Sequence, residues 1–296
     1  MALSLIDVGT TANDGTGDPL RTAFQTVNTA ITALNNNPHR NMLINSTFAI
    51  NQRLFAGGAL TAAVYGHDRW KASTGNADYT VSGETVTLTS GAIEQIIEAP
   101  VLQSKAVVFS VEDPTATLTI TVAASGSGSG STSGTITSGS GRRGLALTVP
   151  AGATGNIQVK IAGTSAAFAR PQFERSTVDT PFDRRPAGLE LLLCQRYYQT
   201  KTAGAVGVWY TSTNCLLGFQ FGQPMRAASS SVVVLNTAPT VGEVGVTNRV
   251  GSGSAIVSSP FSASGGQVSL NGFTGATVGK TAVMVTDGVL GFSAEL

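Results

Sequence analysis

Two short groups of aromatic and polar residues offer the clearest chemistry in this sequence. The denser group is Tyr65-Gly-His-Asp-Arg-Trp70, and the second is the pair Trp209-Tyr210. Aromatic faces stack on the apolar side of a sugar ring, while planar polar side chains bond its hydroxyl groups. On this basis we predict carbohydrate contacts from five residues: Tyr65, His67, Trp70, Trp209 and Tyr210.

The competing interpretation of both groups is structural. In the first group, Trp70 would be a buried side chain, and Asp68 would pair with an arginine at the start of a strand. In the second group, the alternation of side chains along a strand sends Trp209 and Tyr210 to opposite faces of a sheet. One of these two side chains must therefore face outward.

The sequence offers no constellation typical of catalysis. There are only two histidines, His39 and His67, so a histidine-rich metal site is excluded and few Ser/His/Asp triads are possible. The run Gly139-Ser-Gly-Arg-Arg-Gly144 matches a dinucleotide-binding pattern by letter, but it lies in a Ser/Gly tract and no helix follows it. Any two of the 17 acidic residues could meet as a glycosidase pair, yet none is singled out. We therefore expect no catalytic residue, metal or cofactor.

Composition narrows the possible partners. The net charge of +1 gives no footprint for nucleic acid, and no apolar stretch is long enough to span a bilayer. Because the first residues do not resemble a secretory signal, we expect synthesis in a cytoplasm. We therefore predict that Cys194 and Cys215 are buried free thiols, with a disulfide between them as the alternative.

Low charge and abundant glycine are typical of all-β proteins with many turns: 12% of the residues are charged and 35 are glycine. Short alternating runs, such as Leu118–Val122 and Ile157–Ile161, predict a jelly-roll-like β-sandwich over residues 41–185. Further short strands predict a smaller C-terminal β-sandwich knob within residues 186–296. We expect the Ser/Gly tract from Ala124 to Gly144 to be a mobile loop.

A helix is predicted near the N-terminus. Asp18-Pro19 is a favoured helix start, and the polar run Asn35-Asn-Asn-Pro38 ends the pattern. Apolar residues recur at spacings of a coiled-coil seam, and they are Leu20, Phe24, Val27, Ile31 and Leu34. A helix of this length is marginal in water by itself, so the seam must be buried. It either packs on the following β-domain or associates with other copies of itself.

A second helix is predicted between the two β-domains, in the segment Thr180–Gln199. Pro181 and Pro186 hold the chain extended, and good helix formers follow from Leu189 to Tyr198. Three leucines share one side at helical spacing with Arg196 or Tyr197, and they are Leu189, Leu192 and Leu193. We expect Arg184 and Arg185 to pair with acidic neighbours rather than with a ligand: Asp183, Glu174 or Asp179.

Three stretches together resemble parts of bacteriophage tail-fibre and related virion fibre or spike proteins. They are Ile6–Phe24, Asn41–Arg53 continued by Tyr65–Trp70, and the join TPFDRRP-AGLELLLCQRYYQ at Thr180–Gln199. They occur in the expected order and cover roughly a third of the chain. The resemblance implies an oligomeric, mostly β appendage of a virion that contacts the host surface.

The resemblance makes the seam of the first helix a trimerisation site, so that residues 1–40 comprise a virion-anchoring arm and a trimerisation helix. The expected partners are two further copies of the chain, other virion proteins bound through the arm, and a host-surface glycan. The expected function is host attachment without catalysis. One alternative is a structural head decoration or connector. The other is a polysaccharide depolymerase, against which stands the lack of a long repetitive region.

Overall fold

The computed structural model describes residues 15–17, 19–35, 40–229, 231–235, 239–245, 249–250, 255–256, 261–285 and 288–296. The chain is mainly β, as predicted, and every strand pair among these residues is antiparallel. Two apolar cores form, one from residues between Leu43 and Phe173 and the other from residues between Ala205 and Ala294. The boundary predicted at residue 185 falls between them.

The first core belongs to a nine-stranded sheet with the order β6-β5-β8-β3-β9-β4-β7, to which β2 and β1 are attached through β3. Its strands are β1 (Gly58–Leu60), β2 (Lys71–Ser82), β3 (Thr85–Ile97), β4 (Ala106–Glu112), β5 (Leu118–Ser125), β6 (Ser131–Ile136), β7 (Arg142–Thr148), β8 (Asn156–Ala162) and β9 (Ala166–Glu174).

Strand β3 is where this sheet divides. Residues Thr85–Leu88 pair with β9, whereas Ala92–Ile97 pair with β8, so two wings of strands diverge from one long strand. Gly91 lies at the division with a φ of +83°, and a Cβ there would clash with the carbonyl oxygen of Asn76. Only glycine fits both the backbone conformation and the space. Side chains from both wings then share one core.

The prediction of a mobile loop over the Ser/Gly tract, from Ala124 to Gly144, is wrong. The tract is not a free loop, because β5 extends to Ser125 and pairs with β6, which contains Ser131–Ile136. Ile136 is buried, and the ring of Pro150 would clash with a side chain at Gly130. The alternation of Ser and Thr along β6 follows the period of a strand, and turn-prone composition concealed it.

The second core lies between a seven-stranded and a three-stranded sheet, with the orders β15-β14-β18-β11-β12-β17-β16 and β10-β19-β13. The strands are β10 (Tyr198–Lys201), β11 (Val206–Trp209), β12 (Cys215–Gln220), β13 (Ser231–Val234), β14 (Thr240–Glu243), β15 (Arg249–Val250), β16 (Ala255–Ile256), β17 (Gly265–Leu270), β18 (Thr281–Met284) and β19 (Leu290–Ser293). Cys194 and Cys215 are buried free thiols, as predicted.

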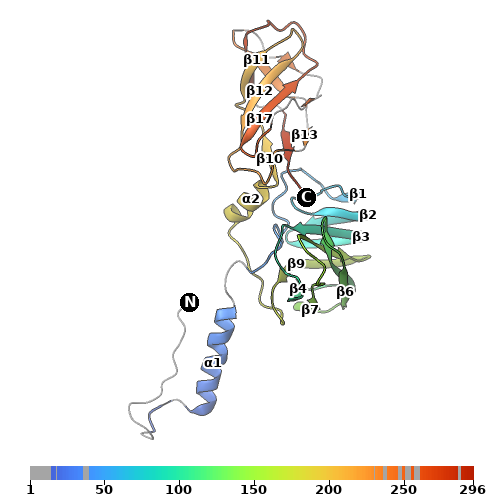
Figure 1. Cartoon of the computed structure of the whole chain (residues 1–296), viewed down its shortest axis with the longest axis vertical. Coiled ribbons are helices and arrows are strands. Elements are labelled where there is room, and N and C mark those ends of the chain that lie inside the picture. The colour runs from blue at the N-terminus through green and yellow to red at the C-terminus, as the bar shows by residue number, and fades with distance from the viewer. Residues whose placement is uncertain are drawn as a thin grey trace.

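Helix α1 (Leu20–Asn35) forms where the seam predicts it and lies apart from both β-domains (Figure 1). Leu20 is 73% exposed and Phe24 is 60% exposed, so this part of the seam does not pack on the chain's own β-domain. Val27 is half-buried. The side chains of Ile31 and Leu34, and residues 1–14 of the predicted arm, lie outside the described residues.

Helix α2 (Ala187–Gln195) lies between the two β-domains (Figure 1). The side that carries the leucines is not the buried side of this helix: the helix buries Glu190 and Cys194, while Leu192 is exposed. Glu190 is held in place because it accepts hydrogen bonds from the backbone of Asn45 and from Arg185. A buried ion pair therefore fixes the helix where the sequence suggested apolar packing. No helix in the described ranges is long and apolar enough to cross a membrane.

Candidate functional site

The first predicted carbohydrate group lies at the junction of the two β-domains. Trp70 is 0% exposed, stacks on Phe48 at 4.8 Å between ring centroids and donates from Nε1 to the carbonyl of Asn45 at 3.0 Å. His67 is buried, with its Nδ1 3.2 Å from the Tyr79 hydroxyl. Because their faces are already covered by protein, the prediction of sugar contacts at Trp70 and His67 is corrected: both are core residues.

Burial sets the ionisation of this group. Loss of water lowers the pKa of His67 from 6.5 to about 4, so its ring is neutral near pH 7. Asp68 is fully buried, and desolvation raises its pKa to about 6, although Arg53 and bonds from Gln52 act in the opposite direction. The carboxylate accepts from the backbone and the side-chain amide of Gln52 at 2.6 and 3.0 Å. The ion pair to an arginine predicted for Asp68 is thus replaced by an amide clamp.

Arg69 and Arg53 instead meet Glu295, near the end of the chain (the C label lies beside β1 and β2 in Figure 1). The guanidinium of Arg69 also donates to the carbonyl of Ile96 and stacks on the Tyr197 ring at 3.6 Å. We call Arg53, Arg69 and Glu295 the C-terminal clasp. It joins the segment that follows strand β19 of the second domain to the first domain.

Tyr65, the remaining residue of the first group, belongs to the surroundings of the clasp. Its hydroxyl donates to the Leu296 carbonyl at 2.8 Å, and desolvation raises its pKa. Lys71 donates to the same oxygen at 3.1 Å. The polar end of Tyr65 is therefore occupied by the chain itself.

A pocket of about 320 Å³ lies between residues 41–50, residues 182–190 and the tip of the β2–β3 hairpin. Arg184 bonds both oxygens of Glu84 at that tip, at 2.5 and 2.7 Å. These bonds hold the pKa of Glu84 down at about 2. Arg185 pairs with Glu190 at 3.2 Å. The partners predicted for these arginines are therefore wrong, although their structural role is as expected.

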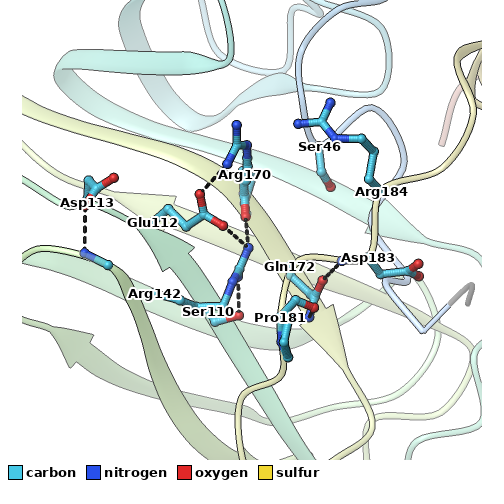
Figure 2. Close-up of polar contacts among 12 residues, drawn as sticks. Ser46, Ser110, Glu112, Asp113, Arg142, Arg170, Gln172, Pro181, Asp183 and Arg184 are labelled. Atoms are coloured by element: carbon cyan, nitrogen blue, oxygen red, sulfur yellow. Dashed lines mark hydrogen bonds and ion pairs between the residues drawn. The ribbon is translucent and has the colours of Figure 1, made fainter. Parts of the chain in front are cut away.

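Figure 2 shows how the same region is fixed to the first sheet. Arg142 donates to the Ser110 hydroxyl at 2.7 Å and to Glu112 at 3.3 Å, and Arg170 donates to the other oxygen of Glu112 at 2.7 Å. Nearby, Gln172 accepts from the backbone of Asp183 at 2.8 Å. Arg142, Glu112 and Arg170 are thus engaged with one another, and Gln172 holds the backbone of the segment after Thr180, so these polar groups serve the fold rather than a ligand.

The second predicted group divides between core and surface. Trp209 is 0% exposed, with its ring edge-on to Phe273 at 4.9 Å, so its predicted sugar contact is corrected in the same way as that of Trp70. Tyr210 is 45% exposed, and its hydroxyl lies 2.6 Å from Ser269 Oγ on β17. Of the five predicted residues, Tyr210 has the most accessible ring.

Sequence reasoning missed two of the acids that hold the arginines of these clusters, Glu295 and Glu84. Glu295 lies 226 positions from Arg69, and Glu84 lies 100 positions from Arg184. No local pattern marks such pairs, because only the folded chain brings them together. Within the described residues, no group of three or more His, Cys, Asp or Glu side chains could hold a metal ion.

Comparison with known proteins gives no family. No family model and no curated protein matches the chain. Among solved structures, a Paenibacillus sp. cycloisomaltooligosaccharide glucanotransferase complexed with cycloisomaltoheptaose aligns with 11% identity and a TM-score of 0.19, over 80% of this chain. The alignment spans 47% of that protein's chain. A likeness at this level carries no argument about fold or activity.

Proposed function

We propose that this chain is a subunit of a homotrimeric virion fibre or spike that binds host-surface polysaccharide without catalysis. In this proposal the nine-stranded sheet forms a jelly-roll-like sandwich, and the second domain is a terminal knob. The N-terminal arm joins the subunit to other virion proteins. The resemblance of three ordered segments to fibre proteins motivates the virion assignment.

The observation that carries the proposal is the exposed apolar seam of α1. Leu20 and Phe24 are mostly open to water, although a helix of 16 residues needs burial of its apolar side to be stable. Packing against two other copies of the same helix supplies that burial at heptad spacing. Three copies also hold three binding sites in fixed geometry, which raises avidity for a repetitive glycan without any new contact.

The seam can be tested in the full chain by light scattering. Phe24→Asp places a charge in the seam, and we expect the trimer mass to fall to the monomer mass. Thr22→Asp is the matched control, because Thr22 is exposed on the opposite side of the same helix. It should leave the trimer intact.

The outcomes separate the parts of the proposal. A monomeric wild-type chain would contradict the trimer and the avidity that depends on it. A Phe24→Asp variant with the wild-type mass would locate the interface in the β-domains. Incubation of the trimer with host polysaccharide, followed by a reducing-end assay, tests the absence of catalysis, since newly released ends would identify a depolymerase.

A further inference from the structure

The outer face of the seven-stranded sheet carries a hollow that none of the clusters above uses. The hollow has a volume of about 350 Å³ and lies at Gly218, Gln220 and Gln267 on the neighbouring strands β12 and β17. Phe219 and Val268 point into the core, so alternation directs Gly218, Gln220 and Gln267 outward. The inner side of the adjoining Gly266 is filled by the ring of Phe261. The hollow therefore opens to solvent.

Glycine forms the floor of this hollow. In the register of the two strands, Gly218 faces Gln267 and Gln220 faces Gly265, so each glutamine stands opposite a residue with no side chain. The two amides thus flank an open strip of backbone. Gln220 and Gln267 are both exposed. Each amide offers donors and an acceptor, which matches the mixed donor and acceptor character of a sugar hydroxyl.

Tyr210 lies on the same outer face. It follows β11, whereas its hydroxyl meets Ser269 on β17, with β12 between the two strands (Figure 1). Neighbouring strands are about 4.8 Å apart, so the side chain must lie across β12 to reach Ser269. A ring held flat on the sheet by its hydroxyl presents its other face to solvent. That is the arrangement needed to stack on a sugar ring.

The outward positions of the strands that carry the hollow and the ring are uncharged. The outward positions of β11, β12, β17 and β18 are valine, leucine, glycine, glutamine, serine and threonine. Val206 and Val208 are exposed there and add apolar surface. An acidic polysaccharide would find no cation on these positions, whereas a neutral one needs only hydroxyl partners and apolar contact.

We propose that this face, made by Tyr210, Gln220, Gln267 and the floor at Gly218, is the binding site for an extended neutral polysaccharide. The Tyr210 hydroxyl meets Ser269, and Gln267 at the hollow lies two residues away on the same strand, about 7 Å. A chain of several sugars is therefore long enough to reach both the ring and the hollow. This inference rests on the proposed function and names the ligand class and the site for it. It also gives Tyr210 a role in binding and adds two glutamines to the predicted contacts.

The test uses a substitution that fills the hollow without disturbing the fold. A Cβ at Gly218 would meet only the Val206 carbonyl oxygen, at an ordinary 3.6 Å, so Gly218→Val should be accepted in the strand. The matched control is Gly75→Val on β2 of the first domain, where a Cβ would have no neighbour within 4 Å. Tyr210→Ala and Gln267→Ala complete the set.

Retardation of the full-length chain is measured in native gels that contain neutral dextran or mannan, beside gels with anionic alginate or hyaluronan. We expect retardation by a neutral polymer, loss of at least tenfold in affinity for Gly218→Val and Tyr210→Ala, and about threefold for Gln267→Ala. Gly75→Val should bind as the wild type does. Melting curves of each variant verify that the fold is retained.

Three results would overturn the inference in distinguishable ways. Wild-type binding that Gly218→Val leaves unchanged would mean that the site lies elsewhere, and the proposed function would stand. Retardation by the anionic polymers alone would refute the neutral ligand class but not host attachment. If none of the polymers retards the wild-type chain, both the inference and the proposed function are contradicted.

Discussion

The domain junction and the outer face of the seven-stranded sheet differ in what their side chains are free to do. The junction has the richer chemistry, with Trp70, His67 and the C-terminal clasp, yet its rings are covered and its charges are paired. The outer face has only a tyrosine and two glutamines of note, but they reach solvent. Availability, rather than density of functional residue types, separates a binding surface from a structural cluster here.

The largest expected effect comes from opening the clasp. Glu295→Ala leaves Arg69 buried without its carboxylate, and breaking a buried ion pair in this way costs about 3–5 kcal/mol of unfolding free energy. Urea unfolding measures the loss. The comparison variant is Arg196→Ala, which removes a pair with Glu98 in which the arginine side chain is 50% exposed. It should cost less than about 1 kcal/mol.

Equal and small losses of unfolding free energy for Glu295→Ala and Arg196→Ala would contradict the burial of the clasp. They would mean that the clasp is hydrated in solution and that the junction is less closed than its geometry indicates. A large loss confined to Glu295→Ala would confirm that the charges of the junction are closed off from water.

The pH dependence of stability should expose the two buried groups of the junction. The folded pKa of Asp68 is about 6, above its ordinary 3.8, so between pH 4 and 6 the folded chain holds a proton that the unfolded chain has released. This contribution to the unfolding free energy therefore falls as pH rises. His67 has a folded pKa of about 4, below 6.5, so only the unfolded chain takes up its proton in that window. Its contribution rises with pH.

These two contributions oppose each other, and each amounts to about 3 kcal/mol at most. We therefore expect Asp68→Asn to make stability rise more steeply from pH 4.5 to 6.5 than in the wild type. His67→Gln should make it rise less steeply or fall. Urea unfolding at several pH values gives the slopes, and the other carboxylates cancel in the difference between variant and wild type. Identical slopes in all three proteins would show that Asp68 and His67 are solvated.

The strands and the first helix were predicted correctly where they depend on local sequence pattern. The alternating runs became β5 and β8, the apolar seam became α1, and the two cores fall on either side of residue 185. Strand β6 was missed because Ser, Thr and Gly are frequent in loops, and only pairing with β5 makes the tract a strand. Composition describes what a segment tolerates, whereas its neighbours decide what it becomes.

The candidate site was predicted only in part, for the same reason. Sequence alternation required one of Trp209 and Tyr210 to face outward, but only the core could decide which one. Gln220 and Gln267 carry no local signal, because a glutamine beside a glycine is common in any strand edge or turn. They form part of a candidate site because the β12–β17 register places each glutamine opposite a glycine.

The smallest expected effect tests whether Tyr210 is held flat. Tyr210→Phe keeps the ring and removes the hydroxyl that meets Ser269 at 2.6 Å, so we expect a loss of about 1 kcal/mol or less in unfolding free energy. Polysaccharide affinity should fall several-fold, because the ring keeps its stacking face but loses the bond that orients it. Thr211→Val is the control, since it removes a neighbouring hydroxyl whose bonds to Thr213 are local and do not cross the sheet. If Tyr210→Phe binds as tightly as the wild type, the apolar surface beneath the ring, rather than its hydroxyl, sets the orientation, and the face tolerates more freedom than the junction does.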